Sequence, residues 1–375
     1  MKEYLQLIIN PGSTSTKVAV YRGTEVVASE TIRHSVEELA PFSNIADQYE
    51  FRLEVILRML ETHGIAVSQL DSVVVRGGLL YPMEGGTYLV NELMCTQLKK
   101  AVNGEHASNL GALIGKSIAE GNPGIKCYTA DPVVVDEMMD EARPTGLPEI
   151  NRRSIFHALN QKAIGRRAAA DLGTRYEHAS LNVAHLGGGI SVGAHHNGRV
   201  IDVNNALNGD GPITPERAGT LPAGQLAELC FSGRYTLPEI KKLLCGRGGI
   251  VAHLGTNDGK EMAARVESGD TEATRVLRAA AFTVAKEIAL RAVALKGRVD
   301  AIALTGSFVY FTQFVAWIEE FAGFLGPIRH YPGEDEMLAL MEAGLRVLSG
   351  EEAPRQYTIA APPSPEYAKP TEAQK

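Results

Sequence analysis

Three turns rich in glycine, serine and threonine each follow an apolar segment with the alternation of a β-strand: Asn10–Lys17, His185–Ser191 and Thr305–Ser307. Such a turn offers backbone N–H groups and hydroxyls to an anion, which is the chemistry of phosphate binding. One turn of this kind is more often only a tight hairpin, but three in one chain favour a nucleotide. None has the P-loop or Rossmann pattern, so a P-loop enzyme and a nicotinamide dehydrogenase are poor fits.

Phosphoryl transfer also needs cations and the groups that position them. Arg76 ends an apolar strand in front of two glycines, and Arg217 lies in a loop too polar to be core. Asp131 follows another predicted strand, and His157 stands at a helix start. The plainer alternatives are a solvated strand end for Arg76, a loop salt bridge for Arg217, a cap on a helix around Val134–Met138 for Asp131, and a helix-end histidine for His157. Residue types and spacing leave these alternatives open.

A weak internal repeat predicts the elements that carry these residues. Asn10 falls on His185, Gly12 on Gly187 and Gly23 on Gly198, each pair 175 positions apart. Both copies read as strand, Gly/Ser turn, strand, tight turn and strand, and helical segments follow each copy. A duplicated α/β domain explains this better than chance similarity of two hairpins.

Other segments complete the expected organisation. We expect domains at 1–148 with a returning helix at 336–350, and at 149–335, followed by a solvated tail at 351–375 that contains five prolines. The expected helices and strands include a helix at 42–63, strands at 72–75 and 126–130, an Ala-rich helix at 271–295, a strand at 299–304, a helix up to 321 and a last helix at 334–348.

Composition limits the function classes. The chain has 375 residues and a formal net charge of −7, which argues against a general nucleic-acid binder. No apolar run approaches the ~20 residues of a membrane helix, and the first residues lack the layout of a signal peptide. The four cysteines form no metal-binding spacing. We expect reduced thiols in a cytoplasmic protein that contacts neither nucleic acid nor membrane.

The longer motifs carry a family resemblance. The opening INPGSTSTK and the segment VAHLGGGISVGAHHNGRVIDVNNALNGDGPITPERAG, with VRGG, GEHASN, TADP, FHALNQKA, ALTGS and YPGEDEM between and after them, resemble the butyrate kinase branch of the acetokinase family. That family is part of the superfamily of acetate and sugar kinases, Hsp70 and actin, and the resemblance covers roughly residues 4–349. It implies two duplicated RNase H-like (actin-like ATPase) α/β domains with a central cleft.

The resemblance also implies residue roles. The catalytic residues are expected to be Arg76, Asp131, His157 and Arg217, and the acyl pocket is expected to contain Val75, His106 and Phe156. Nucleotide binding is expected at His185, Gly187, Gly188, Gly189, Asp258, Gly306 and Ser307. Phosphate and Mg²⁺ are expected at Asn10, Ser13, Ser15, Lys17, Asp335 and Glu336.

The implied reaction is ATP-dependent phosphorylation of butyrate or a branched short-chain acid to the acyl phosphate, and its reversal, in a homo-oligomer with Mg²⁺. HASN and HLGGG favour the butyrate branch, and Asn208 stands where acetate kinases have a pocket proline. Acetate kinases have an arginine at the position of Val73, so Arg76 must take its role, and FHALNQ lacks the second histidine of their FHGTSH motif. The alternatives are an acetate or propionate kinase and a non-catalytic nucleotide-binding member of the superfamily.

Overall fold

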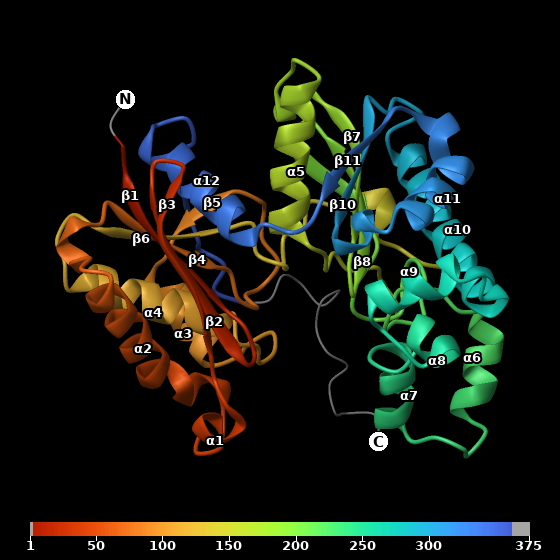
Figure 1. Ribbon diagram of the computed structural model, residues 1–375, viewed down its shortest axis with the longest axis horizontal. Coiled ribbons are helices and arrows are strands. Elements are labelled where there is room, and N and C mark those ends of the chain that lie inside the picture. The colour runs from red at the N-terminus through yellow and green to blue at the C-terminus, as the bar shows by residue number, and fades with distance from the viewer. Residues whose placement is uncertain (1–2, 362–375) are drawn as a thin grey trace. The chain divides into compact units, whose positions relative to one another are not determined.

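The computed structural model describes residues 3–361, which form two compact α/β units. Unit 1 comprises residues 3–135 and 335–361, and unit 2 comprises Asp136–Glu334. The units divide at 135/136 and 334/335, whereas the sequence suggested 148/149 and 335/336. Each unit is built on one sheet (Figure 1). Among the described residues, no helix has the length and apolar content needed to cross a membrane.

Unit 1 has a seven-stranded sheet in the order β12-β5-β6-β4-β1-β2-β3. Strand β1 runs parallel to β4 and antiparallel to β2, and β4 runs parallel to β6. All residues of β1 are buried, as expected for a central strand covered on both faces. The strand bounds are β1 Leu5–Pro11, β2 Ser15–Arg22, β3 Glu25–Arg33, β4 Ser72–Arg76, β5 Thr87–Leu89, β6 Lys126–Ala130 and β12 Arg355–Gln356.

Helices α4 and α12 cover opposite faces of this sheet, because successive residues of β4 point in opposite directions. A Cβ atom built on Gly115 of α4 would lie 2.6 Å from Val75, while one built on Gly344 of α12 would lie 2.6 Å from Val74. Glycine at these positions therefore allows both helices to approach the strand closely. The helices of unit 1 are α1 Val36–Leu39, α2 Tyr49–Thr62, α3 Glu92–Lys99, α4 Asn109–Glu120 and α12 Glu336–Leu348.

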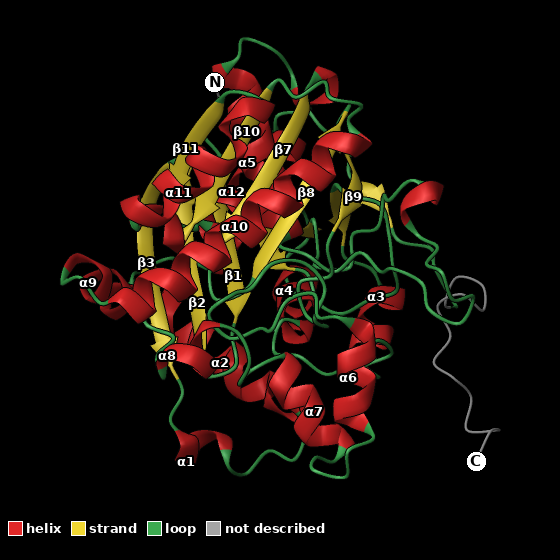
Figure 2. Ribbon diagram, turned by 90° about the vertical axis from the view of Figure 1, so that its right-hand side faces the viewer, coloured by secondary structure: helices red, strands yellow, loops and turns green. Residues whose placement is uncertain are grey.

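Unit 2 has a five-stranded sheet in the order β11-β10-β7-β8-β9, with helices on both faces (Figure 2). Leu181 and Val183 of β7 pack with α5, whereas Ala184 and Leu186 pack with α10. The strands are β7 Ser180–Leu186, β8 Ile190–His196, β9 Arg199–Val203, β10 Ala301–Gly306 and β11 Ile328–Pro332. The helices are α5 Ala158–Asp171, α6 Ala223–Cys230, α7 Leu237–Leu244, α8 Ile250–Leu254, α9 Gly259–Glu267, α10 Thr271–Ala294 and α11 Thr312–Ala322.

The duplicated α/β fold predicted from the repeat is confirmed. The bounds of β1 and β7 differ by the same 175 positions as the sequence repeat. Gly23 and Gly198 both adopt positive φ, at 57° and 79°, in the second turn of each copy. Both copies also have a register shift where the middle strand pairs with the third strand. The order β4-β1-β2-β3 in unit 1 thus corresponds to β10-β7-β8-β9 in unit 2.

The segment after residue 350 differs from the expected solvated tail. Strand β12 pairs in parallel with β5, and Tyr357 is only 2% exposed. The Tyr357 hydroxyl donates to Gln97 Oε1 at 2.7 Å, and Asn91 Nδ2 donates to the Tyr357 carbonyl at 2.8 Å. One aromatic residue with partners in unit 1 therefore outweighs the polar, Pro-rich composition around it. The remainder of the expected tail, 362–375, lies outside the described residues.

Candidate active site

The carboxyl ends of three neighbouring parallel strands bring Asn10, Arg76 and Asp131 to one edge of the unit 1 sheet. Asn10 lies near the end of β1, Arg76 ends β4, and Asp131 directly follows β6. Arg76 is the register partner of Ala130, the residue before Asp131. In open α/β sheets this edge is where ligands bind.

Glu336, the first residue of α12, joins two of these side chains. Its Oε2 atom accepts a hydrogen bond of 2.7 Å from Asn10 Nδ2 and forms an ion pair of 3.1 Å with Arg76 Nη1. Both charged side chains remain about one quarter exposed, at 27% for Arg76 and 24% for Glu336. A carboxylate at a helix N-terminus is also favoured by the helix dipole.

Close backbone packing fixes the position of Arg76. A Cβ atom on Gly111 of α4 would lie 2.7 Å from the Arg76 carbonyl oxygen. One on Gly77 would lie 2.5 Å from Pro132, the residue after Asp131. A larger residue at 111 would push α4 away from the end of β4, and one at 77 would push Pro132 away, so both glycines serve close packing around Arg76.

Asp131 has an unusual backbone, with φ of +39°. Its Oδ1 atom accepts a hydrogen bond of 2.7 Å from the Gly86 N–H, and its side chain is buried. The alternative that it caps a helix at Val134–Met138 is wrong, because those residues are not helical. A non-glycine residue held in this region is strained and needs surrounding contacts to keep it there.

Of the predicted phosphate residues, Ser13 lies in the turn after β1, and Ser15 and Lys17 lie in the first part of β2; Ser13 and Lys17 are exposed. Arg52 of α2, which sequence reasoning missed, is fully buried beneath this turn. Its guanidinium donates to the carbonyl oxygens of Gly12 at 2.8 Å, Ser13 at 3.0 Å and Ser15 at 3.2 Å. Burial lowers the pKa of Arg52 to about 10. The available signal was a charged residue on the apolar face of a predicted helix.

The structure gives two predicted acyl-pocket residues of unit 1 different surroundings. His106 Nδ1 accepts from the Ser108 N–H at 3.1 Å, and desolvation together with the charge of Arg76 lowers the pKa of His106. Val75 is fully buried and packs in the core against α4. A substitution at Val75 therefore tests packing before it tests acyl length.

The donor set of unit 1 is compatible with Mg²⁺. No three His, Cys, Asp or Glu side chains of the described part of the chain form a metal-binding group. Mg²⁺ is usually held by one or two carboxylates together with substrate phosphates and water. Glu336 supplies one carboxylate and Asn10 one amide, so these residues fit an ion that depends on the phosphates for its remaining ligands.

In unit 2, His157 and His185 stack face to face. Their ring centroids are 3.8 Å apart, with 13° between the ring planes. His157 is the residue before the first turn of α5, as predicted, and its Nδ1 atom lies 2.8 Å from Ser191 Oγ. His185, near the end of β7, is bonded through Nδ1 to Asn160 at 2.8 Å and through Nε2 to Glu334 at 3.2 Å.

The glycine turn between β7 and β8 has one open and two crowded positions. A Cβ atom on Gly188 would meet nothing within 4 Å. One on Gly187 would lie 2.8 Å from Glu334 Oε1 and 3.1 Å from His185 Nε2. One on Gly189 would overlap the Arg217 guanidinium. The turn therefore brings the side chains of His185 and Arg217 to the same stretch of backbone.

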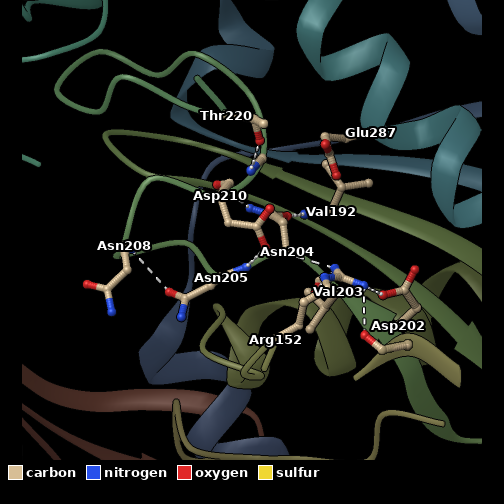
Figure 3. A network of polar contacts seen from close by, with 12 residues as sticks. Arg152, Val192, Asp202, Val203, Asn204, Asn205, Asn208, Asp210, Thr220 and Glu287 are labelled. Atoms are coloured by element: carbon tan, nitrogen blue, oxygen red, sulfur yellow. Dashed lines mark hydrogen bonds and ion pairs between the residues drawn. The ribbon is translucent and has the colours of Figure 1, made fainter. Parts of the chain in front are cut away.

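The loop that carries Arg217 is held by a polar network (Figure 3). Arg217 Nη1 donates to the Ala206 carbonyl. Asn204 Oδ1 accepts from the Val192 N–H at 2.7 Å, and Asp210 Oδ2 accepts from the Asn205 N–H at 3.0 Å. These bonds attach the loop to β8 and fix the carbonyl that Arg217 contacts.

An ion cluster missed by sequence reasoning lies under that loop. Asp202 of β9 pairs with Arg152 at 2.9 Å and with Arg291 of α10, and Arg291 pairs with Glu287 at 2.5 Å. Burial raises the pKa of Glu287. Asn208, in the same loop, is exposed, and its N–H donates to Asn205 Oδ1 at 3.2 Å (Figure 3).

The remaining predicted nucleotide residues separate into two places. Gly306, with φ of +97°, ends β10 beside β7, and Ser307 follows it with its side chain exposed. Asp258 caps α9, where Oδ1 accepts from the Lys260 N–H at 2.7 Å. Phe156, predicted for the acyl pocket, is buried immediately before His157.

Three consecutive acidic residues have three different contacts. Glu334 contacts His185 in unit 2. Asp335 caps α12 by accepting from the Leu338 N–H at 2.8 Å. Glu336 holds Asn10 and Arg76 in unit 1.

One known protein family matches the part of the sequence that contains the unit 2 site. A sequence model described as the acetokinase family matches residues 148–316, which include the stacked histidines, the glycine turn and Arg217. The match covers less than half of the 375 residues.

Over about nine-tenths of the chain, the fold resembles that of solved acetate and propionate kinases. Acetate kinase from Porphyromonas gingivalis has a TM-score of 0.76 at 19% identity, over 92% of this chain and 100% of that one. A propionate kinase from Francisella tularensis subsp. tularensis SCHU S4 has a TM-score of 0.70 at 17% identity, over 91% and 98%. Acetate kinase from Entamoeba histolytica has a TM-score of 0.72 at 16% identity, over 91% and 99%. At these identities the likeness is one of fold.

Proposed function

We propose that the protein is a carboxylate kinase of the acetokinase family, and that its acid is butyrate or a branched short-chain acid. It transfers the terminal phosphoryl group of ATP to the carboxylate, giving acyl phosphate and ADP, and the reaction is reversible. One observation carries the proposal: His157, His185, Arg217 and a glycine turn converge within the segment that matches the family.

The side chains of unit 2 suit charge stabilisation at a transferring phosphoryl group. A carboxylate is already an anion, so the acceptor needs no strong general base. Catalysis then depends on positioning and on donors aimed at the oxygens where charge develops. The Arg217 guanidinium and the imidazole of His157 would supply such donors, and a glycine turn can add backbone N–H groups for phosphate oxygens.

The side chains of unit 1 suit the acid and the metal. Arg76 would bind the carboxylate or its phosphorylated form, since a guanidinium matches both in geometry. Glu336 and Asn10 would hold Mg²⁺, which neutralises phosphate charge when bound. Asp131, fixed by the Gly86 N–H, would orient the groups at this edge.

The proposed preference for butyrate rests on sequence features separate from those that support the kinase activity. It depends on the HASN and HLGGG motifs and on Asn208, an exposed turn residue at the position where acetate kinases have a rigid proline. One methylene changes discrimination by roughly 10–200-fold in an apolar pocket. We therefore expect kcat/KM for butyrate to exceed that for acetate by at least about tenfold.

The test is a hydroxamate assay for acyl phosphate with MgATP and straight and branched acids from C2 to C6. Arg217→Ala should lower kcat by about 10²–10³-fold, because one transition-state donor is lost. Arg175→Ala, at an exposed arginine that pairs with Glu177 and belongs to none of the motifs, is the matched control and should retain activity. A preference for acetate would make the protein an acetate kinase, and ATP binding without acyl phosphate from any acid would refute the kinase.

A further inference from the structure

A buried chain of polar side chains extends from His157 into the interior of unit 2, and the proposed mechanism does not use it. Ser191 Oγ lies 2.8 Å from His157 Nδ1 and accepts from Gln161 Nε2 at 2.8 Å. Gln161 Oε1 lies 3.0 Å from His195 Nε2, and His195 Nδ1 lies 2.7 Å from the Tyr176 hydroxyl. Ser191, Gln161 and His195 are all fully buried.

The hydrogen-bonding roles in this chain can be assigned from Gln161. Its Nε2 atom also donates to the Ser191 carbonyl oxygen at 2.9 Å, and a carbonyl can only accept. The amide is therefore oriented with Oε1 toward His195, so His195 must donate from Nε2. The Nδ1 atom of a neutral His195 then accepts from Tyr176. Desolvation, with the charges of Lys162 and Arg166, holds the pKa of His195 well below its usual value, which agrees with a neutral ring.

The same assignment determines the direction of the Ser191 hydroxyl. Ser191 Oγ accepts from Gln161 Nε2 and, at 3.4 Å, from the His157 N–H. Among the described residues, the acceptor left for its proton is His157 Nδ1. A ring that accepts at Nδ1 carries its proton at Nε2 when neutral.

The residue spacing along α5 and β8 places the members of this hydrogen-bonded chain on facing surfaces. Gln161 and Gly165 follow His157 at intervals of four along α5, so the three share one helix face. Ser191, Gly193 and His195 are two residues apart along β8 and therefore lie on the same face of the strand. A Cβ atom on Gly193 would lie 2.5 Å from Gln161 Oε1, and one on Gly165 would lie 2.7 Å from Tyr176. Both glycines therefore leave room for members of the chain.

We infer that Ser191 and Gln161 are positioning residues that fix the tautomer of His157, so that its Nε2–H is the donor offered to the transferring phosphoryl group. This inference rests on the proposed function for the identity of the group that receives the bond. Gln161 stands where the second histidine of the acetate kinase FHGTSH motif would stand, so here an amide with one fixed orientation takes the place of a group that can titrate.

The experiment reads the tautomer directly. Full-length protein labelled with ¹⁵N-histidine is examined by NMR at neutral pH, and His157 is assigned by the loss of its signals in His157→Asn. We expect Nδ1 of His157 to resonate as an unprotonated nitrogen and Nε2 as a protonated one. In Ser191→Ala the second tautomer should appear, and kcat should fall by about ten- to hundredfold with KM for ATP unchanged.

Val192→Ala is the matched control. Val192 is the neighbour of Ser191 on β8 and is equally buried, but its side chain lies in the core on the α10 face. This variant should lose stability while keeping the wild-type tautomer and kcat. A proton on Nδ1 of His157 in the wild type, or an unchanged spectrum in Ser191→Ala, overturns the inference. The spectrum is informative even for a protein that makes no acyl phosphate, so the two proposals fail separately.

Discussion

Gly189→Ala should separate activity from stability, because the added methyl group meets a functional side chain and not the backbone. The Nη1, Cζ and Nη2 atoms of Arg217 would all lie within 2.7 Å of the new carbon. The guanidinium must therefore move by about 1 Å or more to reach an ordinary contact distance of ~3.5 Å. It is the flexible end of a long side chain, so it can move at little cost to folding.

A misplacement of about 1 Å at a reacting group can cost about 10²-fold in rate, or roughly 2.7 kcal/mol in activation free energy. We therefore expect kcat for acyl phosphate formation to fall by about 10²-fold in Gly189→Ala, with Tm close to that of the wild type. Gly224→Ala, in α6, is the matched control, because its methyl group enters open space and its φ lies outside the left-handed region. It should keep full activity and could gain about 0.4–1 kcal/mol of stability.

A double-mutant cycle with Arg217→Ala checks the cause. If the methyl group acts through the guanidinium, Gly189→Ala should cost little further activity once Arg217 is removed. Wild-type kcat in Gly189→Ala, or full additivity in the double variant, would refute the reasoning. A large loss of Tm would show that the backbone, and not Arg217, accommodates the methyl group.

Three further predictions concern other parts of the molecule. Tyr357→Ala should lower the free energy of unfolding by about 3–5 kcal/mol in urea titrations, because a buried ring is lost; an unchanged midpoint would contradict the packing of this segment. Because the pKa of His195 is lowered in the folded protein, its contribution to stability is complete above about pH 6.5. Below that pH the contribution should decline, since His195 takes up a proton in the unfolded chain first. The free energy of unfolding should therefore change less between about pH 6.5 and 5 in His195→Gln than in the wild type. Glu336→Gln should raise the Mg²⁺ concentration that gives half-maximal activity, because one carboxylate ligand is lost. An unchanged Mg²⁺ titration would remove Glu336 from the proposed metal site.

The duplicated fold could be predicted because its signals are local. Turn glycines and alternating apolar residues recur 175 positions apart, and backbone conformation at Gly23 and Gly198 follows from residue type. The end of α12 was likewise predicted at Leu348 because the helical pattern is strong.

Contacts between distant residues could not be read from the sequence. Glu334 and Glu336 look equivalent in sequence, yet one contacts His185 and the other holds Arg76 and Asn10. The burial of Tyr357 was likewise hidden, since composition suggests solvent exposure and only tertiary packing decides otherwise. Segment composition reports an average, whereas these outcomes depend on single side chains.

The buried Arg52 orients the carbonyl dipoles of the turn between β1 and β2. Its guanidinium takes the carbonyl oxygens of Gly12, Ser13 and Ser15 from below, so these dipoles point their negative ends into the protein. Without the guanidinium, a peptide plane of the turn could rotate and direct its carbonyl oxygen outward. The electrostatic potential at the outer side of the turn would then become negative and repel an anion. A lysine has no planar fork to reach separate carbonyls at once. Arg52 thus holds the peptide planes of this turn in one orientation, so the direction of the turn's dipoles is set by a side chain buried on its inner side.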